Sequence, residues 1–155
     1  MASIFSKIIR GEIPCYKISE NEEYFAILDI SPLAKGHVLI VPKREVDKYF
    51  DLNSEEIYGI NLFAKRISQA IENAIPCKRV GVAIIGLEVP HAHIHLIPLN
   101  SVEDINFERT KLDLSQELLS DTASFNTAAL TGESKPDTKA KGETVLAGMI
   151  NLNSV

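Results

Sequence analysis

The chain contains no tryptophan, and only two of its 155 residues are cysteines. Cys15 and Cys77 stand far apart and form no Cys-x-x-Cys pair, which argues against a thiolate zinc site and favours two reduced thiols. No apolar stretch approaches the length of a membrane span, and the N-terminus has no apolar segment typical of a secretion signal. We therefore expect a cytoplasmic protein with no membrane partner.

Basic residues are also fewer than acidic ones. Lys and Arg number 16 against 21 Asp and Glu, which gives a net charge of −5, and the basic residues form no run. A broad nucleic-acid-binding surface is therefore not expected, although local hydrogen-bond donors could still hold a single nucleotide. A chain of 155 residues is long enough for one compact domain with its own core.

Histidine is scarce as well, and its placement is the most informative feature of the sequence. Three of the four histidines in the chain, His91, His93 and His95, alternate with apolar residues. Alternate residues of a β-strand point to the same face. A strand over residues 89–98 would therefore carry three imidazoles on one face and an apolar row on the other. Three unrelated surface histidines are a poor explanation in a chain with so few.

The remaining pattern predicts an α+β domain with an antiparallel sheet. The strongest helix prediction covers residues 53–74: Asn53 and Glu56 have the spacing of a capping box, apolar residues recur every three or four positions, and Pro76 follows. Shorter segments predict a helix at residues 3–10, strands at 24–30, 37–41 and 79–85, and the start of a late helix at 115–120. Strands in sequence, with one long helix inserted between them, favour this class over a doubly wound parallel sheet.

Two kinds of site explain three imidazoles in line. In the first, a neutral imidazole attacks an α-phosphate to form a nucleotidyl-histidine intermediate, which water then hydrolyses, while the flanking histidines donate to the phosphate oxygens. In the second, the three histidines bind zinc and leave a fourth position for water. Glu88, three residues before His91, could serve that zinc site as a ligand or base. The spacing alone does not separate the two.

Several segments resemble a known family. Residues 91–97 read His-Ala-His-Ile-His-Leu-Ile, which is similar to the pattern of the histidine-triad (HIT) nucleotide-binding proteins. Residues 4–14 resemble the opening segment of those proteins, and residues 28–32 and 36–43 resemble their central signature in the expected order. The resemblance covers the greater part of residues 1–120 and places all four histidines at active-site positions of the family.

The resemblance implies a HIT-like fold, in which an antiparallel sheet of about five strands carries one long helix and a short N-terminal helix. It also implies a homodimer whose sheet continues across the interface, with two nucleotide sites. Carried onto this chain, it makes His93 the nucleophile and makes His91 and His95 the residues that orient it and contact the phosphate. His37 would sit beside the triad as a supporting residue.

The same resemblance assigns the nucleotide-binding residues. Asp29 would accept hydrogen bonds from the ribose hydroxyls, which suits a carboxylate facing a vicinal diol; a turn cap at the end of a strand is the alternative. Apolar walls for the purine would come from residues that could each be ordinary core instead: Ile4, Phe5, Ile8, Ile13 and Ile30. No cofactor and no metal are required.

The chain departs from the family pattern beside the triad. Glu88 stands where relatives carry a hydroxyl residue that assists the phosphate or the leaving group, and Leu87 replaces a glutamine. A carboxylate there would either repel the phosphate or hand a proton to an amine leaving group. An asparagine of the preceding strand is also missing, since residues 82–85 are apolar. Both departures could slow turnover.

The C-terminal part differs in character. Residues 122–155, and above all 130–136 and 147–151, resemble part of the actuator domain of P-type cation-transporting ATPases, where Glu133 would match the glutamate that positions water. A segment of about thirty residues cannot carry out the cycle of a whole pump domain. We therefore expect a nucleotide-binding domain at residues 1–121 and a fused or disordered tail at 122–155, in which residues 144–150 could form a strand.

Together these patterns predict a nucleotide phosphoramidase or nucleotidyl hydrolase that uses a histidine nucleophile on the α-phosphate of a purine nucleotide conjugate. Glu88 and the missing asparagine keep open a nucleotide-binding module with little turnover. A zinc-dependent hydrolase built on the three strand histidines is the other alternative.

Overall fold

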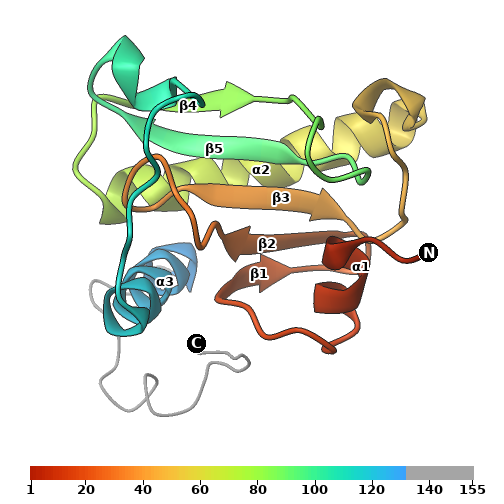
Figure 1. The fold of residues 1–155 in the computed structure, drawn as a ribbon, viewed down its shortest axis with the longest axis horizontal. Coiled ribbons are helices and arrows are strands. Elements are labelled where there is room, and N and C mark those ends of the chain that lie inside the picture. The colour runs from red at the N-terminus through yellow and green to blue at the C-terminus, as the bar shows by residue number, and fades with distance from the viewer. Residues whose placement is uncertain (132–155) are drawn as a thin grey trace.

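The computed structural model describes residues 1–131 of the chain as a five-stranded antiparallel sheet with three α-helices (Figure 1). The strands follow the order β1-β2-β3-β5-β4, so that β3 and β5 are neighbours at the centre of the sheet. Their bounds are β1 Lys17–Glu20, β2 Tyr24–Leu28, β3 Val38–Pro42, β4 Arg79–Ala83 and β5 Ile94–Leu99. The predicted α+β class and antiparallel sheet are confirmed; β1 had not been predicted.

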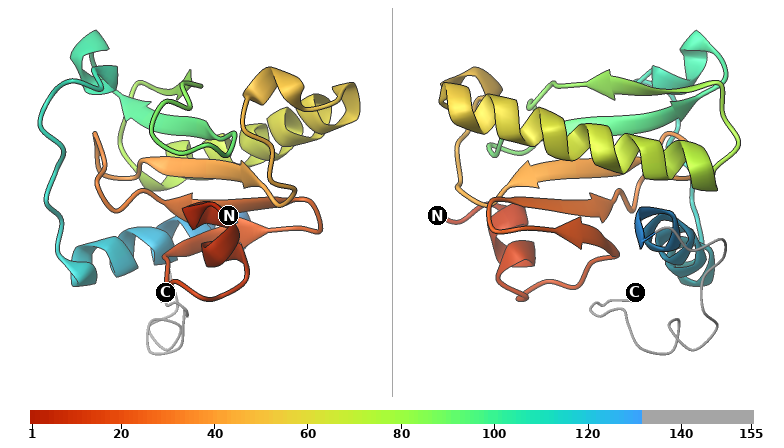
Figure 2. Two further views of the ribbon diagram at one scale, coloured as in Figure 1. Left: turned by 45° about the vertical axis from the view of Figure 1, so that its right-hand side comes forward. Right: turned by 180° about the vertical axis from the view of Figure 1, so that it is seen from behind.

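The two faces of the sheet are covered differently. Helices α2 (Ser54–Ala74) and α3 (Gln116–Thr131) lie behind the sheet, and α1 (Ile4–Ile9) lies on the opposite face, at the end where β3 stops (Figure 2). All five residues of β2 are buried, and they alternate between the two sides. Ala26 and Leu28 join the main core beneath α2, while Phe25 and Ile27 join a smaller apolar cluster with Phe5 of α1. Burial on both faces explains why β2 reads as an uninterrupted apolar run.

The helix ends follow the sequence signals. Asn53 accepts a hydrogen bond from the Glu56 N–H at 2.8 Å and the Glu56 carboxylate accepts from the Asn53 N–H at 2.9 Å, so the predicted capping box is present. Ser3 caps α1 by accepting from the Ser6 N–H at 3.0 Å. Gly11 ends α1 with a φ of 81°, which is favourable for a residue without a Cβ.

The strand predicted at residues 89–98 begins later, at Ile94, so only His95 of the three alternating histidines lies within a strand. The ladder between β3 and β5 ends at the Ile40–Ile94 pair. Further along β3 stands Pro42, which has no N–H and is paired with Tyr24 of β2, and its carbonyl accepts from the side chain of His91. The alternation itself continues through the extended segment, because Ala92 and the apolar residues of β5 that follow it face the core beneath α2.

Helix α3 begins where the late helix was predicted and continues across the expected boundary between residues 121 and 122. Its side chains at Thr122, Ala123, Asn126 and Ala128 are buried, and the helix contacts α2 and β1. The boundary remains a prediction, and the strand expected at residues 144–150 lies outside the described residues. Within residues 1–131, no helix has both the length and the apolar character needed to cross a bilayer.

Asn126 destabilises the packing of α3. It is 0 % exposed, and neither polar atom of its side chain has a hydrogen-bond partner among the described residues. A buried amide without partners costs about 1–3 kcal/mol. We predict that Asn126→Leu raises the free energy of unfolding by an amount in that range, measured by urea titration. Asn73→Leu, at an exposed position of α2, is the matched control and should change it by less than about 0.5 kcal/mol. A loss of stability in Asn126→Leu would contradict the assignment.

Candidate active site

The four histidines of the chain come together on the face of the sheet opposite α2, around the neighbouring strands β3 and β5. His37 directly precedes β3, and His95 of β5 pairs with Leu39 of β3. The residue before His37 is Gly36, whose φ of 93° favours glycine and whose backbone packs so closely that a Cβ there would lie 3.0 Å from Ile75 Cγ1. The predicted grouping of His37 with the triad is therefore what the fold produces.

His91 is fully buried and both of its ring nitrogens have partners. Nε2 lies 2.8 Å from the Pro42 carbonyl oxygen, which can only accept, so Nε2 carries the proton. Nδ1 then accepts from the Ser3 hydroxyl at 2.6 Å. Beside this pair, Glu45 accepts from the Ser6 hydroxyl at 2.5 Å and from the Ser3 N–H at 3.3 Å. The Pro42 carbonyl therefore fixes the tautomer of His91, and the N-terminus of α1 holds the other nitrogen of the ring.

His93 is held through the backbone of His91. Its Nδ1 lies 2.8 Å from the His91 carbonyl oxygen, so Nδ1 donates and the neutral ring has its lone pair on Nε2. The Phe5 ring meets His93 edge-on, with 5.0 Å between the ring centroids. An oriented imidazole with a free Nε2 lone pair is the form that a nucleophile requires.

His37 and His95 form a second hydrogen-bonded pair. The Leu33 N–H lies 3.0 Å from His37 Nδ1, which therefore accepts and leaves the proton on Nε2. His37 Nε2 in turn lies 3.0 Å from His95 Nδ1, so this nitrogen accepts and the His95 proton is on Nε2. In the neutral state the pair thus presents an N–H of His95, and the centroid of the His93 ring lies 4.8 Å from that of His95.

Asp29 follows β2 and makes the turn cap that the sequence offered as the alternative to ribose binding. Its Oδ1 accepts from the Ser31 N–H at 2.8 Å, which is the turn cap, and its Oδ2 lies 3.6 Å from His37 Nε2. Burial raises the pKa of Asp29; the Ser31 N–H and Lys111 oppose that rise, and Glu88 adds to it.

Burial lowers the pKa of every histidine in the group. For His37 the loss of hydration, together with the charges of His95, Lys111 and His93, lowers the pKa to about 3. For His95 the same cause, with His93 and Lys111, lowers the pKa to about 4. The pKa of His91 and that of His93 are lowered by burial, against the opposing effect of a carbonyl acceptor. All four rings are therefore neutral at physiological pH.

Asp29, His37 and His95 also have the composition of a metal site, since one ligand atom from each lies within 4.8 Å of the others. The hydrogen bonds oppose this use. A metal on His37 Nε2 would move the ring proton to Nδ1, where the Leu33 N–H already points. The triad is no better suited, because both ring nitrogens of His91 are engaged.

Other predicted residues lie around this group. Glu88 is exposed, and its charge acts on both His93 and Asp29. Phe5 is buried against His91 and His93, and Ile8 packs beside it. Of the remaining apolar residues proposed as purine walls, Ile4 and Ile30 are exposed and Ile13 is half-buried.

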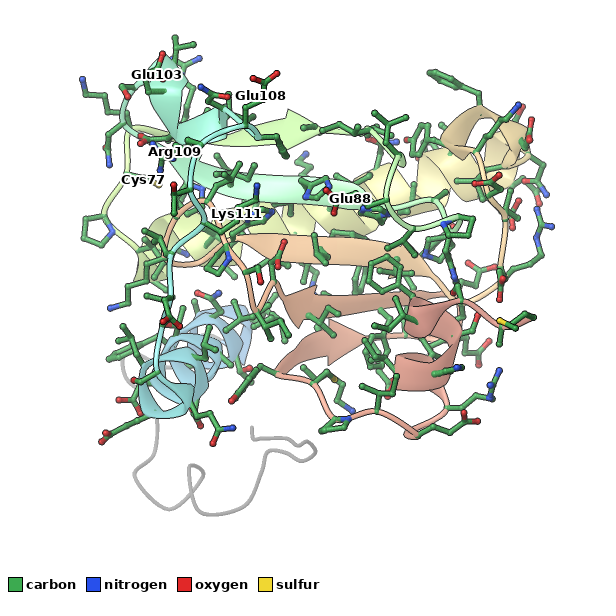
Figure 3. All side chains as sticks on the ribbon, in the orientation of Figure 1. Cys77, Glu88, Glu103, Glu108, Arg109 and Lys111 are labelled. Atoms are coloured by element: carbon green, nitrogen blue, oxygen red, sulfur yellow. The ribbon has the colours of Figure 1, made fainter. Side chains whose placement is uncertain are left out.

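The sequence did not reveal two neighbours from the segment after β5. The Phe107 ring stands edge-on to His95, with 4.8 Å between centroids, and Lys111 acts on the charges of Asp29, His37 and His95. Figure 3 labels Lys111 and Arg109 on that segment and Glu88 on the loop before β5. No repeat or spacing marks these residues, so only the fold brings them to the site. For Ser3, the helix-cap position was a partial signal.

Comparison with known proteins gives two family matches. A model described as the HIT domain matches residues 10–102, and one described as the P-type ATPase actuator domain matches residues 111–155. The adenosine 5′-monophosphoramidase hnt1 of Schizosaccharomyces pombe is 39% identical over 100 residues, a match covering 63% of this chain and 74% of that protein. The adenosine 5′-monophosphoramidase HNT1 of Saccharomyces cerevisiae is 40% identical over 98 residues, covering 63% of this chain but only 62% of that protein.

Solved structures share the fold. A zinc-bound histidine triad family protein from Mycobacterium smegmatis superposes with a TM-score of 0.74 at 27% identity, covering 85% of this chain and 95% of that one. A HIT family protein from Bacillus anthracis superposes with a TM-score of 0.63 at 33% identity, covering 78% and 92%.

The low histidine pKa values predict a loss of stability in acid. Unfolding returns each pKa to about 6.5, so below that pH the unfolded chain binds protons that the folded chain does not. Acidification therefore favours unfolding, down to about pH 4 for His95 and about pH 3 for His37. Between pH 7 and 5.5 each of these two histidines should cost about 1 kcal/mol of unfolding free energy, measured by urea titration at both pH values. Unchanged stability across that interval would contradict their burial as neutral rings.

Proposed function

This chain belongs to the HIT domain family, and from that premise we propose that it is a nucleotide phosphoramidase or nucleotidyl hydrolase that works without a metal or cofactor. The observation that carries the proposal is the state of His93. Its Nδ1–H is bound to the His91 carbonyl at 2.8 Å, and its pKa is lowered by burial, so a neutral nucleophilic Nε2 is available at physiological pH.

The reaction we propose has two steps. His93 Nε2 attacks the α-phosphorus of a nucleoside phosphoramidate, the P–N bond breaks, and the amine leaves as it takes up a proton from solvent. Water then attacks the nucleotidyl-histidine and gives up a proton to solvent, which releases the nucleoside monophosphate and frees the imidazole. The N–H of His95 is the donor best suited to the charge that develops on the phosphate oxygens.

For the nucleoside we propose recognition by Asp29 and the apolar residues beside it. The carboxylate of Asp29 would accept from the ribose hydroxyls through Oδ2, because the Ser31 N–H already occupies Oδ1. A purine would lie against the exposed Ile30 and the half-buried Ile8. The names of the two yeast relatives support an adenosine nucleotide as the first substrate to test.

A nucleotide-binding module with little turnover is the second candidate, and Glu88 is the observation that favours it. Its carboxylate adds negative charge beside His93 and Asp29, where an anionic phosphate would have to bind. Micromolar binding of adenosine monophosphate, together with no burst of product from adenosine 5′-phosphoramidate, would select this candidate. The zinc hydrolase has less support, because a metal on the triad would have to break a hydrogen bond of His91.

We also propose that the protein is a homodimer. Strand β4 stands at the edge of the sheet, where antiparallel pairing with a second copy would continue it. Large apolar side chains are exposed on β4, on the residues after it and on α2, which contacts β4: Val82, Ile84, Ile85, Tyr58 and Leu62. The cytoplasmic location expected from the sequence remains a prediction.

We predict that His93→Gln abolishes turnover of adenosine 5′-phosphoramidate in excess EDTA, with a loss of at least about a thousandfold in kcat. Glutamine keeps a polar group but cannot form the covalent intermediate. The wild-type rate should also fall as the pH drops below the pKa of His93, because protonation removes the lone pair. Activity retained in His93→Gln, or a rate restored only by zinc, would contradict the mechanism.

The dimer is tested by placing a charge on the exposed face of α2. Leu62→Lys should shift the molar mass measured by light scattering from dimer to monomer, because a buried ammonium in the interface costs several kcal/mol. Val102→Lys, at an exposed apolar residue of a different segment, is the control and should leave the mass unchanged. A monomeric wild-type chain, or a dimer that tolerates Leu62→Lys, would contradict the proposed interface.

A further inference from the structure

The segment at residues 106–112, which we call the strap, lies beyond the residues matched by the HIT model and crosses the loop between β2 and β3 (Figure 1). Two hydrogen bonds join the strap to that loop. The Leu112 N–H donates to the Pro32 carbonyl at 2.8 Å, and Arg109 Nη2 donates to the Leu33 carbonyl at 2.6 Å. The strap therefore holds the backbone on both sides of Leu33.

Arg109 is itself held in place. Its Nη1 donates to the Glu103 carbonyl at 2.9 Å and lies 3.5 Å from Asp104 Oδ1, and only about a third of the side chain is exposed. The guanidinium is planar and presents several donors in a fixed arrangement, so it can join the Leu33 carbonyl to the turn at residues 103–104 without flexing. This makes it a rigid connection between the end of β5 and the loop before β3.

The loop held by the strap fixes the His37–His95 pair. One peptide group, between Pro32 and Leu33, accepts from the Leu112 N–H and donates to His37 Nδ1 at 3.0 Å. His37 Nε2 then donates to His95 Nδ1 at 3.0 Å. Hydrogen bonds in such a chain polarise one another in the same sense, so each favours the same arrangement of protons. The chain ends at the Nε2–H of His95.

Phe107 of the strap covers the same two rings. Its ring centroid lies 4.8 Å from that of His95 and 6.3 Å from that of His37, and both contacts are edge-on. An aromatic edge against the pair lowers the polarity around the two rings, which strengthens their hydrogen bond and disfavours a charged imidazolium.

We propose that Arg109 is a positioning residue that, through the strap and the Leu33 N–H, keeps His95 in the tautomer with its proton on Nε2. In the other tautomer a lone pair would face the anionic phosphate, and in the imidazolium the Nδ1–H would oppose the His37 N–H. This inference rests on the proposed function for its kinetic consequence, while the tautomer itself can be observed without any substrate.

Several charged groups face this pair and bear on its titration. His93 and Lys111 act on both His37 and His95, and Asp29 lies 3.6 Å from His37 Nε2. Glu88 acts on His93 and Asp29 from the loop before β5. Lys111 belongs to the strap, so loosening the strap also moves a positive charge that opposes protonation of the pair.

The test compares the full-length wild type with Arg109→Met, Arg109→Lys and the control Arg66→Met, which changes an exposed arginine of α2. Long-range ¹H–¹⁵N NMR spectra report the tautomer and the pKa of each histidine. We expect His95 to carry its proton on Nε2 in wild type and Arg66→Met, and to be mixed in Arg109→Met with a pKa near the free value. The kcat of Arg109→Met should then fall about tenfold at pH 5.5 and much less at pH 8.

Arg109→Lys keeps one donor to the Leu33 carbonyl and should give a smaller change of the same sign. Thermal unfolding detects whether Arg109→Met folds. If it does not, Arg109→Lys is the variant compared with the wild type. A His95 tautomer and pKa unchanged in both variants would overturn the inference, even if stability or kcat fell. A wild-type chain without turnover would count against the proposed function alone, because the NMR result is independent of it.

Discussion

The site depends on one physical requirement: a buried imidazole must find a hydrogen-bond partner for each nitrogen that water cannot reach. His91 meets it with Ser3 and Pro42, and His37 meets it with the Leu33 N–H and His95. In each case one partner has a single role: the Pro42 carbonyl can only accept and the Leu33 N–H can only donate, and that partner fixes the proton on the ring. The tautomers of the four rings follow from these contacts, and the free lone pair on His93 is a consequence of them.

The fold supplies those partners from distant parts of the chain. The cap of α1, the end of β3 and the loop before β3 supply them directly, and the strap after β5 holds that loop, while α2 and α3 cover the opposite face of the sheet. The main apolar core lies beneath α2, and the histidines lie on the other face of the sheet. The residues of the first face can therefore be suited to packing, and the histidines of the second to hydrogen bonding. Helix α3 shows the cost of a mismatch, because Asn126 is buried there without partners.

Much of this could be predicted from the sequence, because the strongest signals are local. The capping box of Asn53 and Glu56 requires residues three apart, and the alternation after residue 91 requires only a strand period. The start of β5 could not be read this way, since the residues before Ile94 bond to groups far away in the sequence: the His91 ring to the Pro42 carbonyl and the Ala92 N–H to the Val46 carbonyl. Phe107 and Arg109 could not be predicted either, because their partners, the His95 ring and the Leu33 carbonyl, lie on other elements that only the fold brings close.

Because the imidazoles of this site are neutral, the affinity of the site for an anion would depend less on salt concentration than that of a site built from cationic side chains. A phosphate held by lysines or arginines is bound through net charge, and dissolved ions screen that attraction over about 10 Å at 0.1 M. The histidines here are uncharged at physiological pH, and on the proposed function an anion would meet the oriented N–H dipole of His95, the N–H of the four rings that no other histidine or carbonyl accepts from. At such a surface a ligand is selected by its shape and by the direction of its hydrogen bonds. Its affinity would therefore change little with ionic strength.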